Sequence, residues 1–158
     1  MRGEGQSERA IGAAGALACP PLRSVTVIRH AAPKDVPAIQ QLLRSLPDVW
    51  QDSWREDVVE RALDSARDLA FVAEEDDQIV GFASGHDTGF RAYLSELAVS
   101  RSHQRKGIGA QLVRRIEAEL TARGCAVLIA DVDPPAEPFY RKLGWRAPRA
   151  TLLGHRVR

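Results

Sequence analysis

The stretch from Tyr93 to Arg123 reads YLSELAVSRSHQRKGIGAQLVRRIEAELTAR and combines a strand pattern, a basic glycine loop and a helix pattern. The apolar residues Leu94, Leu97 and Val99 are of the kind that is buried, and the run ends at Ser100, which predicts a strand. After the glycines, apolar residues recur at helical spacing between charged ones, at Leu112, Val113, Ile116 and Leu120. The stretch therefore predicts a strand, a loop and a helix in direct succession.

The loop of this unit has the chemistry of an anion site. A helix that begins at Gly107–Gly109 leaves its first backbone N–H groups without partners, at the positive end of the helix dipole. Glycine can adopt positive φ there and has no Cβ to hold a phosphate away from the backbone. Basic side chains crowd the same loop, namely Arg101, His103, Arg105 and Lys106. The pattern favours phosphate binding, but an ordinary strand-to-helix turn with a solvated basic loop also satisfies it.

Two common nucleotide-binding patterns are absent from this loop. The P-loop requires Lys and then Ser or Thr after its last glycine, whereas Ala110 and Gln111 follow Gly109. The dinucleotide fingerprint G-x-G-x-x-G requires a third glycine where this chain has Leu112. We therefore expect neither a P-loop nucleotide site nor a dinucleotide site.

Two motifs together resemble one known family. Gln104–Gly109 (QRKGIG) is similar to the Q/R-x-x-G-x-G/A signature of the Gcn5-related N-acetyltransferase (GNAT) superfamily, and Leu97–Val99 resembles the end of that family's fourth strand. Pro138–Trp145 (PFYRKLGW) resembles its F-Y-x-x-L-G-F segment, with Trp in place of the last Phe. The resemblance covers Val25 to Trp145. It implies an α/β single-domain GNAT fold with three αβα layers and a mixed, mostly antiparallel sheet.

The resemblance also implies acetyl-coenzyme A (acetyl-CoA) as co-substrate. Its pantetheine arm would pair with the backbone of the central strand like an added strand, and its pyrophosphate would lie on the loop N–H groups. The coenzyme-binding residues implied in this way are Leu97, Ala98, Val99, Gln104, Arg105, Lys106, Gly107, Ile108, Gly109 and Ala110. Family members often place an Asn against the coenzyme arm, whereas this chain offers Asp133 there, so that contact does not carry over.

The family's reaction is direct attack of an amine on the thioester, which needs a proton acceptor and a proton donor. Tyr140 matches the family tyrosine near the coenzyme sulfur, and its alternative role is packing beside Phe139. Glu96 on the central strand is the first candidate for the base and Asp131 the second, since the family places this base variably. A Glu on a strand surface can equally be only a solvated side chain.

The acceptor is expected to bind near the connection Asp48–Trp54, because the family commonly forms one wall of the acceptor site there. Trp50 and Trp54, with neighbouring aspartates, are suited to an amine-bearing or aromatic acceptor, although tryptophans beside a helix often only pack. The acceptor would be a small-molecule amine or an amine of a peptide or protein. Two alternatives stay open: a transferase for a longer acyl chain, and a non-catalytic module that binds acyl-CoA as a sensor. A homodimer is compatible with all three.

Length, composition and charge limit the domain number, the partners and the location to be expected. The 158 residues suit one domain, and 44% hydrophobic and 27% charged residues are typical of a globular chain. The net charge of +1 indicates neither a nucleic-acid partner nor a membrane surface. The cysteines, Cys19 and Cys125, suggest no disulfide framework, which fits a cytoplasmic location, and no metal-ligand spacing occurs. We expect a disordered extension over residues 1–22, no transmembrane segment, and the acetyltransferase domain over residues 23–158.

Patterns outside the central unit predict the remaining elements. Before it we expect a strand over Ser24–His30, helices from Pro33 and over Arg55–Ala66, and an antiparallel hairpin that turns at Asp76–Gln78. Gly85–Phe90 is expected to be a polar link. After the unit we expect an apolar strand over Cys125–Asp133, a short helix from Pro134, and a final strand or hairpin in the tail Trp145–Arg158.

Overall fold

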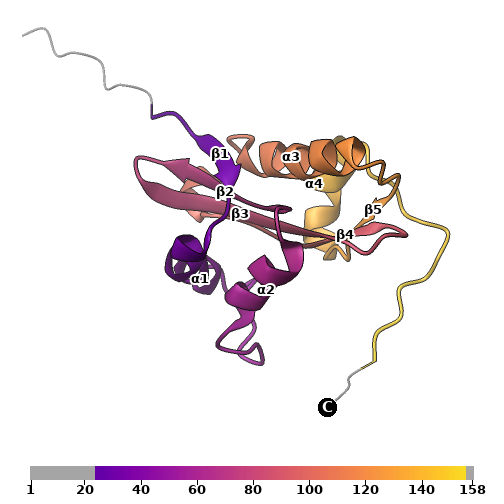
Figure 1. The fold of residues 1–158 in the computed structure, drawn as a ribbon, viewed down its shortest axis with the longest axis horizontal. Helices are drawn as coiled ribbons and strands as arrows, with labels where there is room; N and C mark the ends of the chain where they lie inside the picture. Colours follow the sequence, from indigo (N-terminus) through magenta and orange to yellow (C-terminus); the bar gives the residue numbers. More distant parts are fainter. Residues whose placement is uncertain (1–23, 156–158) are drawn as a thin grey trace, which may run out of the picture.

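The computed structural model describes residues 24–155, so the extension expected over residues 1–22 lies outside the described residues. Five strands form one sheet in their order along the chain, β1-β2-β3-β4-β5 (Figure 1). The first four strands pair antiparallel and β4 pairs with β5 in parallel, which confirms the mixed, mostly antiparallel sheet. The strands are β1 (Val27–His30), β2 (Ala70–Glu75), β3 (Gln78–Asp87), β4 (Ala92–Val99) and β5 (Leu128–Ile129).

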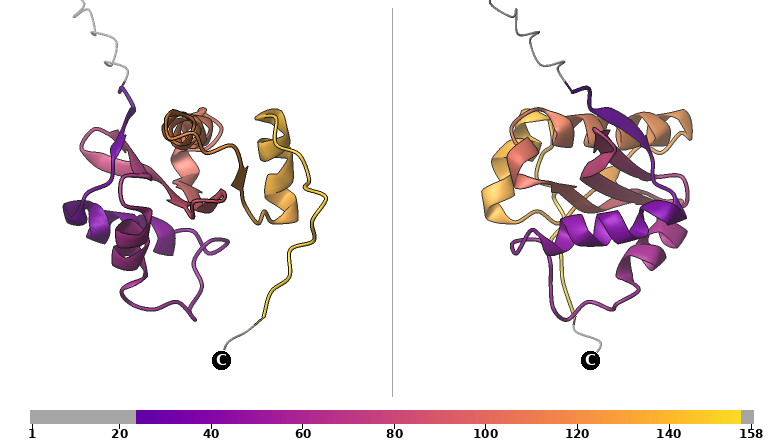
Figure 2. Two further views of the ribbon diagram at one scale, coloured as in Figure 1. Left: turned by 45° about the vertical axis from the view of Figure 1, so that its right-hand side comes forward. Right: turned by 90° about the vertical axis from the view of Figure 1, so that its left-hand side faces the viewer.

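Helices cover both faces of this sheet and make it the middle of three layers (Figures 1 and 2). On one face lie α1 (Val36–Arg44), which follows a 3₁₀ turn at Pro33–Asp35, and α2 (Val58–Ala66). On the other lie α3 (Ile108–Ala122) and α4 (Glu137–Lys142). Each face has its own apolar core, because each helix presents an apolar stripe to the sheet. The single-domain α/β fold implied by the resemblance is therefore confirmed.

Helix α3 lies unusually close to the sheet because β3 presents glycine beneath it. A Cβ on Gly81 would lie 3.1 Å from side-chain atoms of both Ile108 and Leu112. A Cβ on Gly85 would lie 3.0 Å from Ile116. Contacts this short are rare for a Cβ, so a larger residue at either position would require the facing α3 side chains to shift. The two glycines therefore set the height of α3, and with it the position of the loop that precedes the helix.

A β-bulge interrupts β4 in the middle of the strand. Ser84 of β3 pairs with Glu96, but the next β3 residue, Gly85, pairs with Leu94, so Ser95 is an extra residue on β4. Side chains alternate along a strand, and an extra residue reverses the alternation. Leu94 accordingly packs in the α3 core, while Ala98, four residues later, packs in the core beneath α1. The bulge thus decides which face receives Glu96.

Three expected elements differ from the observed ones. Gly85, His86 and Asp87 belong to β3, because they pair with Leu94, Tyr93 and Ala92, so the expected link shrinks to a four-residue turn. The strand expected over Cys125–Asp133 is formed only at Leu128–Ile129, since the chain is partly exposed before it and turns away from β4 after it. Cys125 is half-buried and lies outside β5.

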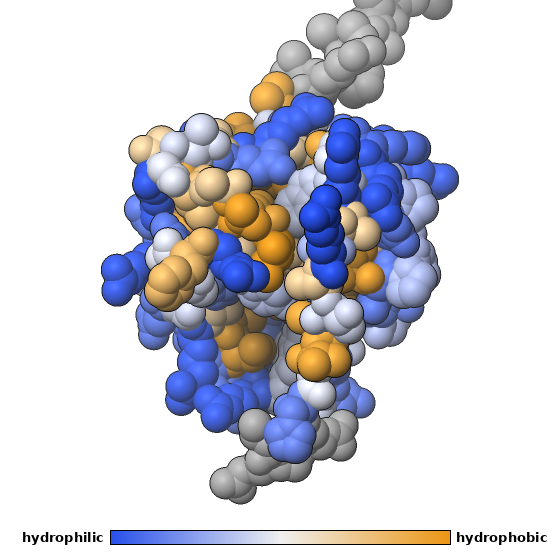
Figure 3. Space-filling view, turned by 90° about the vertical axis from the view of Figure 1, so that its right-hand side faces the viewer, coloured by the Kyte–Doolittle hydropathy of each residue, from blue (hydrophilic) through white to orange (hydrophobic). Residues whose placement is uncertain are grey.

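The tail is the third difference. Residues 145–155 form neither a helix nor a strand within the described part of the chain, so the expected final strand or hairpin is wrong for these residues. Trp145 still packs against the core beneath α3, but Leu152 and Leu153 are 71% and 87% exposed. It runs away from the body along one side of the molecule (Figure 2). In Figure 3 it borders a furrow with apolar surface on both walls.

Candidate active site

The site lies where two parallel strands part. β4 and β5 pair only at Ala92 with Leu128 and Tyr93 with Ile129, and beyond this point they diverge. A cavity of about 840 Å³ opens there. Its walls come from the α1–α2 connection, from β4 around its bulge, from the chain after β5 and from α4. The lining residues are Asp48, Val49, Gln51, Trp54, Leu94, Ser95, Glu96, Leu97, Asp131, Val132, Asp133, Pro134, Pro135, Ala136 and Tyr140.

The edge of β4 that borders this gap can accept an added strand. Ser100 N–H donates to the Val80 carbonyl at 2.8 Å, so Ser100 and Ala98 direct their backbone groups toward β3. Leu97 and Val99 alternate with them and direct theirs toward the gap. The Val99 carbonyl already accepts a hydrogen bond from Gln104 Nε2 at 3.0 Å. Of the three expected strand residues, Leu97 and Val99 thus present backbone groups to the gap, and Ala98 contributes packing instead.

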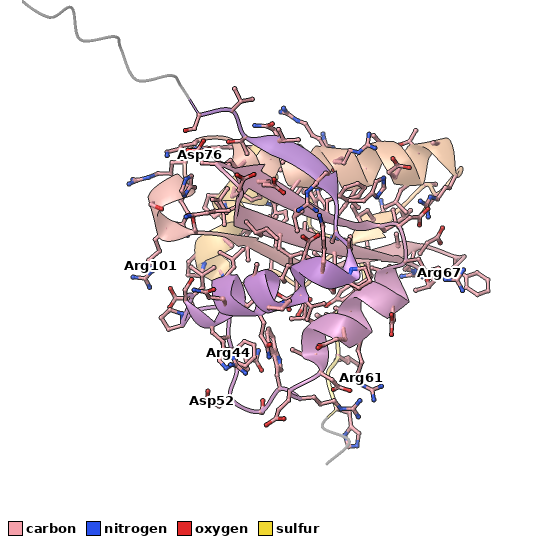
Figure 4. All side chains as sticks on the ribbon, turned by 60° about the vertical axis from the view of Figure 1, so that its left-hand side comes forward. Arg44, Asp52, Arg61, Arg67, Asp76 and Arg101 are labelled. Atoms are coloured by element: carbon pink, nitrogen blue, oxygen red, sulfur yellow. The ribbon has the colours of Figure 1, made fainter. Side chains whose placement is uncertain are left out.

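A second hollow of about 450 Å³ continues along this edge toward the basic loop. It shares Asp48, Val49 and Leu97 with the main cavity and reaches Arg101 and Gln104 at its far end. Arg101 projects outward from the loop (Figure 4) and lies 3.7 Å from the Asp48 carboxylate. The structure therefore connects the cavity and the loop by a continuous path.

The loop has the geometry of an anion site. Gly107 is the N-cap of α3 with φ +85°, a left-handed conformation that glycine adopts without strain, and outside the adjoining chain no atom lies within 4 Å of where its Cβ would stand. The first intrahelical bond runs from Gln111 N–H to the Gly107 carbonyl at 3.1 Å. The N–H groups of Ile108, Gly109 and Ala110 therefore precede the helical ladder. Arg105 and Lys106 are exposed beside them.

Gly109 serves packing as much as ligand access. A Cβ there would lie 3.4 Å from Phe139 Cζ, so a larger residue would press α3 away from α4. The ring of Phe139 in turn packs edge-on against Tyr140, with ring centroids 5.0 Å apart. The two glycines of the motif thus have different tasks: Gly107 permits the turn, and Gly109 lets α4 approach α3.

Glu96 and Tyr140 both line the main cavity, from β4 and α4 respectively. Burial, and then the charge of nearby Asp131, raises the pKa of Glu96 to about 7. Burial, and then the charges of Glu96 and Asp131, raises the pKa of Tyr140 to about 12. At neutral pH, Glu96 is therefore poised between its two protonation states and Tyr140 keeps its proton.

Asp131, the second candidate base, is engaged elsewhere. Its carboxylate accepts a hydrogen bond from the Tyr93 hydroxyl. Burial and this bond together raise the pKa of Tyr93 to about 12. Sequence analysis did not single out Tyr93, and only the pairing of Tyr93 with Ile129, two residues before Asp131, brings the two groups together.

The two tryptophans separate in the structure. Trp54 lines the cavity. Trp50 does not, because it packs on the α1 core with the Arg44 guanidinium 4.9 Å from its ring centroid. The two rings meet edge-on at 5.5 Å, so Trp50 supports Trp54 from behind. Asp52 stands on the exposed tip of the connection and is not part of the lining (Figure 4).

The charged side chains in the described lining of the main cavity are all acidic. Its described lining contains four carboxylates, from Asp48, Glu96, Asp131 and Asp133, and neither Lys nor Arg. The loop at the other end of the path is basic.

Within residues 24–155, no three or more His, Cys, Asp or Glu side chains group so as to hold a metal ion. No helix among these residues is both long and apolar enough to cross a membrane.

The fold is similar to those of solved acetyltransferases. The chain superimposes on the aminoglycoside N-acetyltransferase AAC(6')-Iy in complex with CoA with a TM-score of 0.71 and 20% identity, covering 88% of this chain and 99% of that one. A second similar structure is the aminoglycoside acetyltransferase meta-AAC0020 from an uncultured soil metagenomic sample, with TM-score 0.66, 23% identity, and 84% and 95% of the two chains covered.

Sequence comparison identifies the family. The Acetyltransferase (GNAT) family model matches residues 36–145, and the chain belongs to this family. Acetyltransferase ECA0875 of Pectobacterium atrosepticum is 32% identical over 102 residues, which cover 63% of this chain and 72% of that protein. An acetyltransferase of Yersinia pestis is 30% identical over the same shares. The protein is therefore an acetyltransferase of the GNAT family, as the two motifs implied.

Proposed function

We propose that the protein transfers an acetyl group from acetyl-CoA to a primary amine of a small cationic molecule, by direct attack of the amine. The observation that carries this proposal is that Glu96 of β4 and Tyr140 of α4 line one cavity, at the end of a path that begins at the anion site of the loop. A proton acceptor, a proton donor and a site for the coenzyme phosphates thus lie along one continuous surface.

The chain offers the coenzyme two kinds of backbone contact. The strand-edge groups of Leu97 and Val99 would hold the pantetheine arm, and the N–H groups of Ile108, Gly109 and Ala110 would hold the pyrophosphate. Arg105 and Lys106 add positive charge, and Gln104 holds the end of β4 through its bond to Val99. The open space around the Gly107 Cα fits a phosphate group. When bound, the coenzyme supplies the activated thioester carbonyl.

Glu96 accepts a proton from the attacking amine. An ammonium ion has no lone pair, so it must be deprotonated before it can attack, and a base with a pKa of about 7 does this efficiently near neutral pH. Glu96 stands beside the bulge, where the strand edge that would hold the thioester begins. Asp131 keeps the pKa of Glu96 high and stays hydrogen-bonded to Tyr93.

Tyr140 donates a proton to the departing sulfur, and the state of Glu96 helps it to do so. The negative charge of Glu96 is one of the causes of the raised pKa of Tyr140. Once Glu96 has taken the amine proton it is neutral, so this contribution disappears and Tyr140 becomes a stronger acid. The transfer of the amine proton to Glu96 therefore favours the later transfer of the Tyr140 proton to the sulfur.

Three features support a small cationic acceptor. The carboxylates of the cavity attract a cation, and Trp54 adds an aromatic ring to the lining. Similar structures include aminoglycoside acetyltransferases, whose names indicate small-molecule amines as acceptors. The amine of a peptide or protein is the alternative acceptor. Tyr140 argues against a purely acyl-CoA-binding sensor, because binding requires the loop but no proton donor.

Thiol release from acetyl-CoA against a panel of alkylamines, polyamines, aminoglycosides, amino acids and short peptides tests the proposal. We expect release with small amines, together with a thermal shift on coenzyme binding. Coenzyme binding with no release from any acceptor would favour the sensor, and release from peptides alone would favour a protein amine. Faster turnover of a longer acyl-CoA would identify a different acyl donor.

A further inference from the structure

A third hollow adjoins the active-site cavity at Trp54. It has a volume of about 350 Å³ and lies between α2 and the strands β3 and β4. Trp54, Ser95 and Glu96 line both this hollow and the main cavity. The two spaces therefore meet along these three side chains, directly beside the proposed base.

Apolar residues form the floor and part of the walls of the hollow. Its floor consists of Leu43, Val59 and Phe82, which belong to the core beneath α1 and α2 and are almost fully buried. Its walls include Val58 and Ala62, which are half-buried on the side of α2 that faces β3. This composition contrasts with the main cavity, whose lining holds four carboxylates.

Apart from Glu96, the polar side chains in the described lining of the hollow have partners. His86 Nε2 lies 2.7 Å from Ser95 Oγ and its Nδ1 lies 3.0 Å from Ser65 Oγ, while Ser95 Oγ also lies 2.7 Å from Ser84 Oγ. Burial lowers the pKa of His86, so the ring is neutral at neutral pH.

Among the described residues, the lining of the hollow includes one arginine, Arg61, and no lysine. Arg61 stands on the exposed side of α2 (Figure 4) and pairs with Asp57 at 2.6 Å. A polar ligand group would have to displace one of these existing bonds, whereas an apolar group would displace only water.

We propose that this hollow is the apolar compartment of the acceptor site: it takes the alkyl or aryl substituent of an amine whose nitrogen lies at Glu96. The inference rests on the proposed function and adds the substrate class, an amphipathic primary amine. A dry cavity of about 150 Å³ already holds benzene, so the hollow has room for a phenyl ring or a short alkyl chain. Trp54 then lies between the apolar substituent and the polar cavity.

A series of straight-chain primary amines from ethylamine to hexylamine, with phenethylamine added, tests the proposal through kcat/KM in the thiol-release assay. The alkylamines have nearly the same basicity, so a trend among them reports burial of methylene groups. We expect kcat/KM to rise about two- to fourfold per methylene until the hollow is filled. The rise should appear mainly in KM, since the added carbons lie away from the reacting nitrogen.

Ala62→Phe places a ring in the hollow, and Glu60→Phe is the matched control, because Glu60 lies on the exposed side of the same helix outside the lining. We expect Ala62→Phe to abolish the chain-length trend and to leave ethylamine turnover within about twofold of wild type. Glu60→Phe should retain the trend. Ethylamine turnover and the thermal midpoint report whether each variant is folded, and Ala62→Leu should flatten the trend partly.

The outcomes separate the two proposals. Acetylation of ethylamine without any chain-length trend in the wild type, or a trend unchanged in folded Ala62→Phe, would overturn the apolar compartment and leave the proposed function standing. Absence of acetylation with every amine, despite coenzyme binding, would overturn the proposed function and this inference with it. A trend lost in Ala62→Phe alone would establish the compartment.

Discussion

At Glu96, two effects act in the same direction. Burial beside the bulge disfavours the carboxylate, and the nearby charge of Asp131 disfavours it further, so the pKa rises to about 7. A Glu on the exposed face of a strand would have a pKa near 4 and would be a poor base for an ammonium ion. The chemistry proposed for this residue thus depends on its surroundings more than on its type.

The pH dependence of the reaction should report Glu96. Because only the deprotonated form accepts the amine proton, we expect kcat/KM to rise with pH and to level off above about pH 7. Glu96→Gln should lower kcat/KM roughly 10²-fold or more and remove this limb. Asp131→Asn, the matched control, should keep activity and move the limb to lower pH, because the second cause of the raised pKa is gone.

Glu96→Gln should also stabilise the fold. Glu96 binds a proton more tightly in the folded state (pKa about 7) than in the unfolded state (ordinary pKa), so its contribution to stability falls as pH rises between these two values. We expect Glu96→Gln to raise the free energy of unfolding at pH 8 by roughly 1–3 kcal/mol, with little effect at pH 4. Denaturant titrations at the two pH values measure this, and a variant less stable than wild type at pH 8 would contradict it.

Tyr140→Phe removes a hydroxyl and keeps a ring that packs on Phe139 and Trp145, at centroid distances of 5.0 and 5.1 Å. We expect kcat to fall about 10²-fold or more, while CoA affinity and the thermal midpoint stay near wild type. Tyr93→Phe is the control, since Tyr93 bonds Asp131 from the paired part of β4 and is outside the cavity lining. Equal turnover in wild type and Tyr140→Phe would remove Tyr140 from the mechanism.

At the scale of elements, the bulge in β4 organises the site. It reverses the side-chain alternation between Leu94 and Ala98, which turns Glu96 toward the α1–α2 side. It lies two residues beyond the last pair with β5, so the strand edge becomes available where the base stands. Ser84, Ser95 and His86 hold the bulge through hydrogen bonds of 2.7 Å. A loss of this network should therefore disturb Glu96 before it disturbs the core.

The loop before α3 is the second organising element, and Gly107 tests its role. A Glu at this position would place a carboxylate beside the N–H groups of the first helical turn. Gly107→Gln has the same size and the same left-handed strain, of roughly 1–2 kcal/mol, but no charge.

We expect Gly107→Glu to bind CoA at least about tenfold more weakly than Gly107→Gln at low salt, with a smaller difference at high salt. Isothermal titration of CoA into both variants measures this. Equal affinity of the two variants for CoA would mean that the phosphates bind elsewhere.

At the scale of the whole molecule, one ion-pair network ties the first strand to both neighbouring elements. Asp35 is 5% exposed and accepts bonds from Arg29 Nη1 and Nη2 at 2.7 and 2.9 Å and from Ala32 N–H at 2.8 Å. Arg29 Nε also donates to Glu74 of β2 at 2.7 Å. The Arg29 bonds hold the pKa of Asp35 below its usual range, against the opposing effect of burial.

Arg29→Met should destabilise the protein by about 3–5 kcal/mol at pH 7, because it leaves a buried carboxylate without its cation. Since the folded pKa of Asp35 is lowered, its contribution is present above the ordinary pKa and is lost as pH falls through the folded value. The penalty should therefore shrink in acid. The double variant Arg29→Met, Asp35→Leu should recover much of the loss, as thermal unfolding would show; no recovery would mean that Arg29 acts through Glu74.

A near-neutral net charge conceals two opposite local fields in this protein. The basic loop and the acidic cavity lie at the two ends of one path along β4, although the chain carries only +1 overall. Such a separation suits a reaction between a phosphate-bearing donor and a cationic acceptor, because each substrate is attracted to its own end. The whole-chain charge could not reveal this, since it sums the two fields.

Sequence alone determined the family, the central strand, loop and helix, and the order of the elements through Tyr140. These depend on local patterns: the apolar period changes at the loop, and the glycines mark its turn. Local patterns did not determine the secondary structure of the tail. Its apolar residues allowed a strand or hairpin, but strands form only against a partner edge, and residues 145–155 pack against none in the structure.

Only the tertiary structure decided the arrangement of the site. Trp50 and Trp54 look equivalent in sequence, yet one supports the α1 core and the other lines the cavity. The bulge at Ser95, the bond from Tyr93 to Asp131 and the apolar hollow beneath α2 each arise from strand pairing or helix packing between distant segments. Local sequence specifies which residues prefer a strand, a turn or a helix. Register, burial and the resulting pKa values depend on which segments meet, so they emerge only when the chain is folded.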